Sequence, residues 1–364
     1  MKRIAILTSG GDAPGMNAAV RAATLLGIGK GLEVFGVQHG YQGLLDDTLV
    51  ALEPQQVQSV IRDGGTMLGS ARCLDFHKKE RRDEARAVLK NRGIEGLIVI
   101  GGNGSLTGLL ALTDPAECEI PLKGIGIPAS IDNDLAITRL AIGVDTAINT
   151  IVDACDKISD TASAHDRTFI VEVMGRQCGY LAMTSAIASA ANAVLFPEMG
   201  KSEDEVVETV VRAVVRAQQR TERSKRVLVI KAEGVGIPIE RLKQRVDERV
   251  REETGRDTIE TRVTVLGHVV RGGRPSALDR MIASRLANTA VEGLLAGHTR
   301  MMTAWTPPAA VPPDHVQRTR NDPQVCLVDL AYTLEETRAM LDGTSNFVKW
   351  RKKVFAEIEE VLSL

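Results

Sequence analysis

The chain has 364 residues, with 45 Lys plus Arg against 47 Asp plus Glu, so its formal net charge is −2. A composition of 44% hydrophobic and 25% charged residues is that of a folded globular protein. The lack of a basic excess argues against a nucleic-acid binder. No apolar run approaches the ~20 residues that a membrane span needs. Glycines follow too early in MKRIAILTSGG for a signal-peptide core.

The cysteines point to a reducing compartment. Their number is odd, their spacings are wide, and no C-x-x-C pattern occurs, which argues against a disulfide scaffold or a structural zinc site. We therefore expect a cytoplasmic protein. The five are Cys73, Cys118, Cys155, Cys178 and Cys326.

Short apolar runs alternate with longer amphipathic stretches along the chain, which predicts βαβ units and about two domains. Continuous apolar strands of this kind are typical of parallel sheets covered on both faces. A proline-rich stretch, 306–315, is expected to lead over the surface to a C-terminal strand at 325–330 and a helix at 346–362. The other predicted strands are 3–8, 32–37, 96–100, 124–127, 168–173 and 226–230, with helices from about Met16, from about Leu106 and over 201–219.

Two glycine-rich segments each lie between a predicted strand and a predicted helix. They are 9–17 (SGGDAPGMN) and 101–105 (GGNGS). Such loops can turn backbone N–H groups toward an anion. The first is not a Walker A loop, because no Lys-Ser/Thr follows at the required spacing. Each loop alone is as well explained as a plain turn, but two in neighbouring βα units could line one polyphosphate.

An acidic segment, 130–134 (SIDND), follows the strand that ends at Pro128. Two carboxylates separated by one residue can divide their roles, one acting as a base and the other contacting a metal. The alternative is a solvated acidic turn.

Four arginines stand near glycine turns, and guanidinium groups bind phosphate in a bidentate manner. Taken one by one, each arginine is more typical of a surface ion pair than of a phosphate ligand. His268 alone is more typical of a packed or helix-capping histidine than of a ligand. The arginines are Arg72, Arg176, Arg262 and Arg271.

Taken together, the motifs TSGGDAPGMNAAVRA, GGNGSLTG, SIDND, VEVMGRQCGYLA, KAEG and VLGHVVRGGRPSALDR resemble the 6-phosphofructokinase A family in order and spacing, from about Arg3 to about Thr289. The resemblance implies transfer of the ATP γ-phosphoryl group to the 1-hydroxyl of fructose 6-phosphate. It also implies two Rossmann-like α/β lobes with mostly parallel sheets and an active site in the cleft between them. We expect a nucleotide-binding lobe of 1–143 plus about 270–320, and a sugar-phosphate-binding lobe of 144–269 plus about 321–364.

The resemblance assigns catalytic roles to five residues. Asp132 would be the general base on the hydroxyl, which agrees with a carboxylate placed beside a strand end. Gly11 would donate its backbone N–H to the phosphates, and Ser130 would orient the phosphoryl group or the water shell of Mg²⁺. Arg72 and Arg176 would offset negative charge in the transition state.

The resemblance also assigns the ligand contacts. Arg167 and Arg262 would reach in from a neighbouring subunit, so the implied state is an oligomer, usually a homotetramer. The residues implied to hold the sugar phosphate are Ser130, Asp132, Arg167, Met174, Gly175, Arg176, Glu233, Arg262, His268 and Arg271. Those implied for the nucleotide are Gly11, Tyr41, Arg72, Cys73, Phe76, Gly102, Asn103, Gly104, Ser105 and Gly108.

The sequence departs from the family at the implied Mg²⁺ contacts, Asn103 and Asp134. The family usually has Asp where Asn103 stands, and an amide oxygen is a weaker ligand for a hard cation. Activity should therefore be retained with weaker metal affinity, and the alternative is a catalytically impaired regulatory homologue.

Single positions also bear on which phosphoryl donor the chain uses and on whether it responds to effectors. Pyrophosphate-using relatives typically carry Asp at Gly104 and Lys at Ala129, so ATP is favoured here. A pyrophosphate-dependent enzyme and a kinase for sedoheptulose 7-phosphate remain alternatives. Leu25, Pro54 and Ser159 replace effector-site arginines of allosteric relatives, while Arg21 is kept. We therefore expect little response to ADP or phosphoenolpyruvate.

Overall fold

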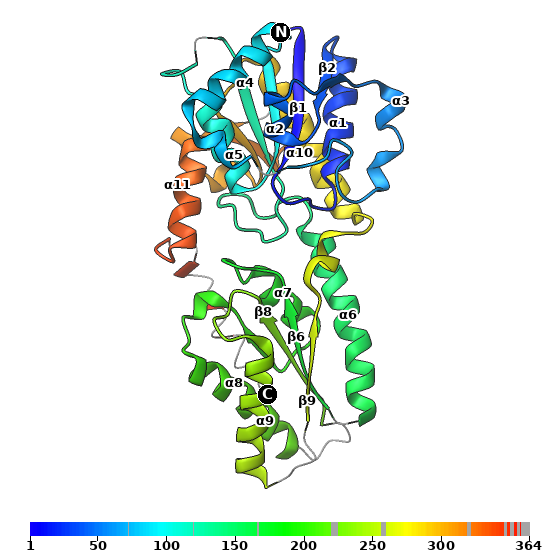
Figure 1. Ribbon diagram of the computed structural model, residues 1–364, viewed down its shortest axis with the longest axis vertical. Helices are drawn as coiled ribbons and strands as arrows, with labels where there is room; N and C mark the ends of the chain where they lie inside the picture. The colour runs from blue at the N-terminus through cyan, green and yellow to red at the C-terminus, as the bar shows by residue number, and fades with distance from the viewer. Residues whose placement is uncertain are drawn as a thin grey trace. The chain divides into compact units, whose positions relative to one another are not determined.

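The computed structural model of the chain describes residues 1–71, 73–118, 120–165, 167–219, 225–255, 260–318, 322–345, 348–349, 353–354 and 357. The chain divides into two compact units (Figure 1). The first comprises Met1–Thr146 and Arg271–Ala339, and the second comprises Ala147–Val270 and Met340–Leu364. Each unit is therefore built from two separate stretches of chain. Within the described ranges, every helix is too short or too polar to span a bilayer.

The first unit is built on an eight-stranded sheet. Strands β1, β2, β4, β5 and β10 run parallel to one another, while β3 and β12 run in the opposite direction, and the edge strand β11 pairs antiparallel with β12. The apolar runs predicted as buried strands form its centre, where β1, β4 and β5 are almost wholly buried. The order across the sheet is β11 (Val316–Arg318), β12 (Val325–Asp329), β10 (Met301–Trp305), β5 (Lys123–Pro128), β4 (Gly96–Gly101), β1 (Arg3–Ser9), β2 (Glu33–Val37) and β3 (Leu49–Ala51).

Helices cover both faces of this sheet, and small residues let them approach closely. On β5, a Cβ at Gly126 would lie 2.4 Å from the side chain of Leu106 in α5, so the α5 face has no room for larger residues. On the opposite face, a Cβ at Gly293 in α10 would lie 2.8 Å from Ile125. The packed helices are α1 (Met16–Gly29) and α10 (Ala277–Leu295), which contact each other, and α2 (Gly40–Leu45), α4 (Lys79–Asn91) and α5 (Asn103–Leu112).

The second unit has a four-stranded, fully parallel sheet. Valines at helical spacing give α8 one apolar face, and they are buried from Val206 to Val214. The strand order is β7 (Ala193–Leu195), β8 (Val227–Ala232), β6 (Thr168–Val173) and β9 (Thr261–Val265). Its helices are α7 (Tyr180–Ala188), α8 (Glu203–Gln219), α9 (Ile239–Thr254) and most of α6 (Val144–His165).

The C-terminal part of the chain differs from the prediction. The expected sugar lobe resumes at about 321, yet β12 pairs with β10 in the first unit, which extends to Ala339. The reason is burial, because Val325, Cys326 and Val328 are fully buried there and complete the sheet. An unpredicted helix, α11 (Leu330–Leu341), follows, and most of the predicted helix at 346–362 lies outside the described residues.

Short elements complete the fold. The helix expected from Leu106 begins three residues earlier, at Asn103. The proline-rich stretch contains two short 3₁₀ turns. These elements are α3 (Pro54–Val57), η1 (Val60–Arg62), η2 (Leu74–His77), η3 (Pro197–Met199), η4 (Gly267–Arg271), η5 (Pro308–Ala310) and η6 (Pro313–His315).

Candidate functional site

Three of the predicted motifs leave the same edge of the first sheet. Strands β1, β4 and β5 are neighbours, and their register places Ser9 beside Gly101 and Gly101 beside Pro128. The three strands therefore end level with one another, and the loops that follow start side by side. This carboxyl edge is where open α/β sheets bind ligands.

The two glycine-rich loops touch each other at Ser105. A Cβ at Gly10, whose φ is +86°, would lie 3.2 Å from Ser105 Oγ, and a Cβ at Gly101 would lie 2.6 Å from the same oxygen. The hydroxyl of Ser70 also donates to the carbonyl of Gly10. The loops can pack this closely because neither glycine has a side chain.

The second loop continues directly into the first turn of α5. Gly102 is the N-cap residue, and the first helical bond runs from the Leu106 N–H to the Gly102 carbonyl. The N–H groups that precede Leu106 therefore face the N-terminal end of the helix, where the helix dipole favours an anion. The space beside Gly104 is open, since a Cβ there would meet no atom within 4 Å.

The acidic loop after β5 is held in place and is not a solvated turn. Ser130 Oγ donates to Asp134 Oδ1 at 2.7 Å. Asn133 has a left-handed φ of 50°, and its amide donates to the Arg139 carbonyl and accepts from the Ala141 N–H, both at 3.0 Å. The Oδ1 atom of Asp132 is buried from solvent. The two carboxylates are thus presented on an ordered loop.

The acidic loop also contacts the second glycine-rich loop. A Cβ at Gly102 would lie 3.6 Å from Ser130 Cβ. Asn103, the first residue of α5, directly follows Gly102. It therefore lies close to the loop that carries Asp134. All three motifs are therefore connected by direct contacts within the first unit.

Arg271 lies against the first glycine-rich loop. A Cβ at Gly11 would be only 2.7 Å from Arg271 Nη1, and this nitrogen donates to the Asp12 carbonyl at 3.3 Å. The family resemblance assigns Arg271 and Gly11 to different ligands, but the structure places the guanidinium directly at the glycine. A cation there adds to the attraction that the loop offers to phosphate.

Asp279 is a structural residue of this region that the sequence analysis does not identify. It is fully buried in α10 and accepts bonds from the N–H groups of Gly143 and Thr146, both at 2.8 Å. Burial raises the pKa of Asp279, while the bonds from Thr146 and Gly143 lower it. Asp279 thereby fixes the start of α6. The available signal is the Ser276-x-x-Asp279 spacing, in which Ser276 caps α10.

The residues predicted to contact the nucleotide form a packed wall beside α5. Tyr41 and Phe76 stack with ring centroids 4.1 Å apart, and the Tyr41 hydroxyl donates to the Ser105 carbonyl at 2.6 Å. Both rings are almost completely buried, and burial raises the pKa of Tyr41 well above its ordinary value. A Cβ at Gly108 would lie 2.9 Å from the Tyr41 ring. Cys73 is half-buried beside them, and Arg72 lies outside the described residues.

In the second unit, the loops after β6 and β8 pack backbone against backbone. The Glu233 N–H donates to the Val173 carbonyl at 2.9 Å, and the Gly234 N–H donates to the Gly175 carbonyl at 3.2 Å. A Cβ at Gly234 would come within 2.0 Å of the Arg176 carbonyl oxygen. The predicted residues Met174, Gly175, Arg176 and Glu233 are therefore brought together, with the Arg176 and Glu233 side chains exposed.

A buried ion pair lies just below this edge. Lys231 of β8 and Glu172 of β6 are register partners, and Lys231 Nζ lies 2.7 Å from Glu172 Oε2. The lysine side chain is only 1% exposed and that of the glutamate 18%. Lys231 lies two residues before Glu233, which directly follows β8. Neither residue of this pair belongs to the predicted ligand contacts.

Two predicted sugar-phosphate contacts lie at the opposite edge of the same sheet. Arg262 is the register partner of Phe169, and Arg167 immediately precedes β6. Met174 lies five positions after Phe169, just past the end of β6, a span of roughly 16 Å at about 3.3 Å per residue. His268, in contrast, follows β9 near the carboxyl edge, where the Leu266 N–H donates to the Glu172 carbonyl at 3.0 Å.

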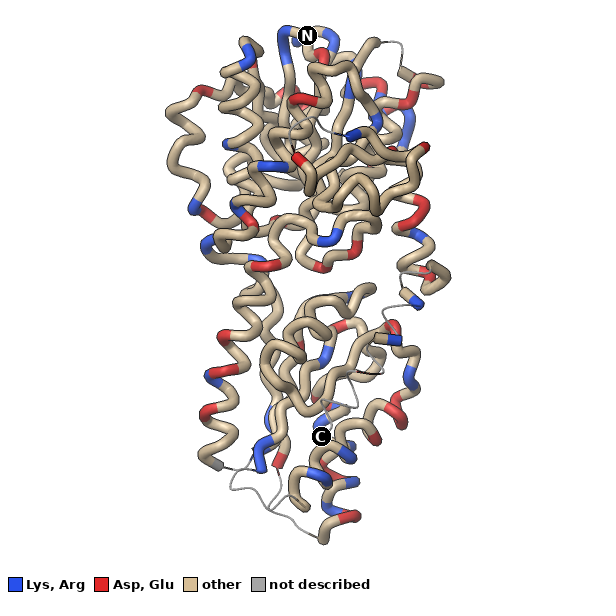
Figure 2. The backbone as a smooth tube through the Cα atoms, turned by 180° about the vertical axis from the view of Figure 1, so that it is seen from behind, with Lys and Arg blue, Asp and Glu red and all other residues tan. Residues whose placement is uncertain are grey.

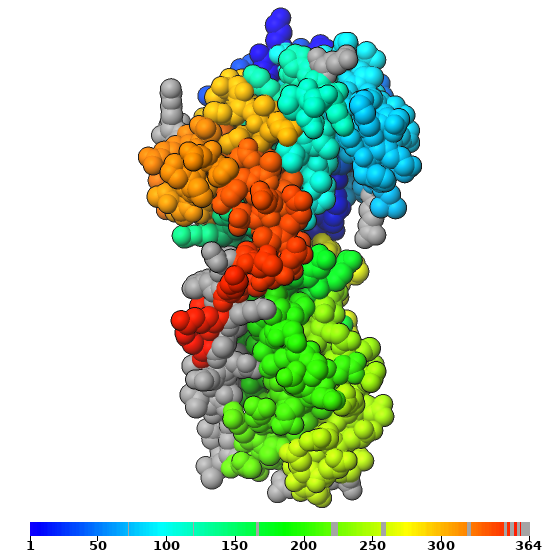
Figure 3. All heavy atoms as spheres, turned by 90° about the vertical axis from the view of Figure 1, so that its left-hand side faces the viewer, coloured from blue at the N-terminus to red at the C-terminus, as the bar shows by residue number. Residues whose placement is uncertain are grey.

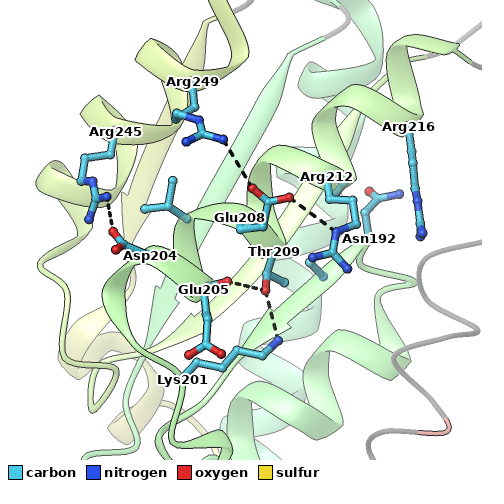
Figure 4. Close-up of a pocket in the computed structure, with 13 residues that line it drawn as sticks. Asn192, Lys201, Asp204, Glu205, Glu208, Thr209, Arg212, Arg216, Arg245 and Arg249 are labelled. Carbon is cyan, nitrogen blue, oxygen red and sulfur yellow. Dashed lines mark hydrogen bonds and ion pairs between the residues drawn. The ribbon is translucent and has the colours of Figure 1, made fainter. Parts of the chain in front are cut away.

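A cavity of about 870 Å³ lies elsewhere in the second unit, along α8 and α9 (Figure 4). Its lining contains none of the predicted site residues. Many of its charges are paired, since Glu208 lies 3.8 Å from Arg212 Nε and 3.7 Å from Arg249 Nη2. Charged residues of both signs lie in this part of the chain (Figure 2), with the acids of α8 in its first half and its arginines in the second half. The cavity is therefore lined by ion pairs, several of which join α8 to α9.

Comparison with known proteins decides the family. A profile described as phosphofructokinase matches residues 3–294. The chain belongs to the phosphofructokinase family. It is 46% identical over 299 residues to ATP-dependent 6-phosphofructokinase 1 of Clostridium perfringens (strain 13 / Type A), covering 82% of this chain and 88% of the relative. It is 49% identical over 300 residues to the ATP-dependent 6-phosphofructokinase of Clostridium botulinum (strain Alaska E43 / Type E3), with the same coverage.

Solved structures agree with this membership. The phosphofructokinase of Saccharomyces cerevisiae superposes with a TM-score of 0.79 at 32% identity, covering 95% of this chain and 47% of that longer chain. The Pichia pastoris phosphofructokinase in the T-state gives 0.82 at 33% identity, covering 96% and 39%. The predicted family and the predicted α/β phosphofructokinase fold with mostly parallel sheets are therefore confirmed.

Proposed function

We propose that the chain transfers the γ-phosphoryl group of ATP to the 1-hydroxyl of fructose 6-phosphate, giving fructose 1,6-bisphosphate and ADP, as a glycolytic enzyme of the cytoplasm. Relatives named ATP-dependent 6-phosphofructokinase are 46–49% identical over most of the chain. The observation that carries the proposal is the meeting of two glycine-rich loops and the Asp132 loop at one sheet edge.

Asp132 accepts the proton of the sugar hydroxyl as that oxygen attacks the γ-phosphorus. A positioned carboxylate base contributes typically about 10²–10⁴-fold to such a step. The reaction is otherwise governed by positioning and charge. The N–H of Gly11 and the first turn of α5 face the phosphates, and Arg271 supplies a positive charge beside Gly11. Arg72 and Arg176 are proposed to stabilise the equatorial oxygens.

The donor atoms present fit Mg²⁺. Asp134 and Asn103 offer oxygen ligands from adjacent loops, and Mg²⁺ commonly combines one or two protein oxygens with substrate phosphates and water. Among the described residues, no cluster of three or more His, Cys, Asp or Glu could hold a metal alone. This agrees with an ion shared with the nucleotide. Bound there, Mg²⁺ would neutralise phosphate charge.

ATP is favoured over pyrophosphate by the space at two positions. The open space beside Gly104 leaves room for a nucleotide. Ala129 is 1% exposed, and its N–H donates to the Gly101 carbonyl at 3.0 Å. Ala129 therefore supplies no cation to contact pyrophosphate.

The proposed oligomer is a homotetramer with shared sites. Arg167 and Arg262 lie at the amino edge of the second sheet, away from Met174 and Glu233, so one copy of this unit does not collect all the predicted sugar-phosphate contacts. A neighbouring copy would supply the two arginines. Native mass spectrometry with and without fructose 6-phosphate tests the assembly.

The function is tested by coupled assays with Mg²⁺ that cross two donors with two acceptors. ATP with fructose 6-phosphate should give the highest kcat/KM. A preference for pyrophosphate would correct the donor, and a preference for sedoheptulose 7-phosphate would correct the acceptor. If no pair gives product, the chain is a regulatory homologue and the proposal is wrong.

A further inference from the structure

The segment 133–139, which begins in the acidic loop, contains two residues with unfavourable backbone φ angles. Within five residues, Asn133 has φ +50° and Ile137 has φ +70°. A β-branched residue rarely adopts positive φ, because its Cβ substituents crowd the backbone. Such a conformation persists only where surrounding contacts hold it, and it is often found beside functional sites. The contacts that hold Ile137 therefore bear on the neighbouring carboxylates.

One of these contacts comes from helix α11. The buried N–H of Ala136 donates to Thr337 Oγ1 at 3.0 Å. The Thr337 hydroxyl in turn donates to the Thr333 carbonyl, one helical turn earlier, at 2.8 Å. Thr337 is fully buried and Ala136 is 9% exposed. The hydroxyl thus links the loop to the helix in a place where water cannot easily replace it.

A second contact comes from strand β10. The Trp305 N–H donates to Thr138 Oγ1 at 3.1 Å, and the Arg139 N–H donates to the Trp305 carbonyl at 3.2 Å. The Thr138 hydroxyl also donates to the Leu140 carbonyl at 3.0 Å. Hydrogen bonds from two elements therefore hold residues 136–139. Helix α11 binds before Ile137, at Ala136, and strand β10 binds after it, at Thr138 and Arg139.

Both elements lie beyond the part of the chain that the family profile matches, 3–294. They belong to the same unit as the acidic loop, and α11 lies on its outer face (Figure 3). We propose that Thr337 is a positioning residue, which fixes the strained segment and thereby the placement of Asp132 and Asp134. This proposal rests on the proposed function, because it names what holds the catalytic base.

The test compares three single variants. Thr337→Val keeps the shape of the side chain but leaves the buried Ala136 N–H without its acceptor. Thr337→Ser retains the hydroxyl and is the conservative rescue. Thr333→Val is the matched control, since Thr333 is also fully buried in α11 but its hydroxyl donates to the Asp329 carbonyl within the helix start.

We expect Thr337→Val to lower kcat by about tenfold, because small misplacements of catalytic groups are costly. The KM values for ATP and fructose 6-phosphate should change by less than about twofold, because the change falls behind the reacting carboxylate and not in the ligand contacts. Thr337→Ser and Thr333→Val should keep the wild-type kcat. A wild-type kcat for folded Thr337→Val, or an equal loss in Thr333→Val, would overturn the proposal.

Hydrogen exchange separates this proposal from the proposed function. Amides of 133–139 should exchange faster in Thr337→Val than in Thr333→Val, whether or not the protein turns over. If the wild-type chain shows no turnover but these amides still exchange faster in Thr337→Val, Thr337 holds the segment and the proposed function alone is wrong. Equal exchange in the two variants would show that Thr337 does not hold the segment.

Discussion

Two regions of this phosphofructokinase present their residues by different means. The acidic loop of the first unit is held by amides and hydroxyls, namely those of Asn133, Thr138 and Thr337. The loops of the second unit that carry Met174 and Glu233 lie above the buried Lys231–Glu172 ion pair. Neutral contacts fix the backbone of the acidic loop without adding charge beside Asp132. The buried ion pair, in contrast, couples β6 to β8 only if both of its partners are present. Substitutions should therefore cost rate in the first region and stability in the second.

The largest effect is expected at the acidic loop. Asp132→Asn keeps the size of the side chain but removes the proton acceptor, so kcat should fall by about 10²–10⁴-fold. The Kd for fructose 6-phosphate should change little. Steady-state kinetics with a separate binding titration measures both quantities, and an unchanged kcat would remove Asp132 from its role.

The next effect should appear in the second unit as lost stability. Lys231→Met leaves Glu172 as a poorly solvated, unpaired charge, and should lower the free energy of unfolding by roughly 3 kcal/mol. Urea denaturation of the purified variant measures this quantity.

The matched control is the double variant Lys231→Met with Glu172→Leu. Because it removes both charges, it should recover most of the lost stability. If the double variant is less stable than Lys231→Met, the ion pair is not what couples β6 and β8.

A smaller effect is expected at the metal. Asn103→Asp restores a charged ligand beside Asp134 and should lower the Mg²⁺ concentration needed for half-maximal rate by several-fold, since carboxylates bind hard cations better than amides do. A Mg²⁺ titration at saturating substrates measures the shift. A titration curve that stays in place would exclude Asn103 from the metal site.

The smallest effect is expected at Asp279, as a dependence of the free energy of unfolding on pH. Burial raises the pKa of Asp279 above its ordinary value of 3.8. A carboxyl with a raised folded-state pKa stabilises the fold below its ordinary pKa, and this contribution is lost as pH rises through the raised value. The stability of the wild type relative to Asp279→Asn should therefore decline as the pH rises above 3.8. Urea denaturation at several pH values tests this, and a difference that grows with pH would contradict it.

The sequence predicts the positions of the ligand loops better than the contacts that support them. Glycine-rich and acidic segments directly follow apolar strands, and parallel strands bring their carboxyl ends to one edge. The bond between Ala136 and Thr337 joins residues 201 positions apart, and no local pattern marks a threonine in a helix as its acceptor. The C-terminal boundary is predicted wrongly for the same reason, because it depends on β12 pairing with β10.

The buried ion pair is partly visible in the sequences of its two strands. Strands TFIVEV and VLVIKA are apolar except for one charge each near their ends. Opposite charges at matching positions of two buried parallel strands predict a pair, provided that the strands are neighbours in register. The sequence alone does not show that β6 and β8 are adjacent in the sheet, because α7, β7 and α8 separate them along the chain.

Single-turnover phosphoryl transfer tests the central claim most directly. Enzyme in excess over γ-labelled ATP, mixed with fructose 6-phosphate and Mg²⁺, should place the label on the sugar 1-oxygen in the wild type. Asp132→Asn should bind both ligands but transfer the label at least about 100-fold more slowly. Transfer at the wild-type rate by Asp132→Asn, or label released by the wild type only as inorganic phosphate, would contradict the account.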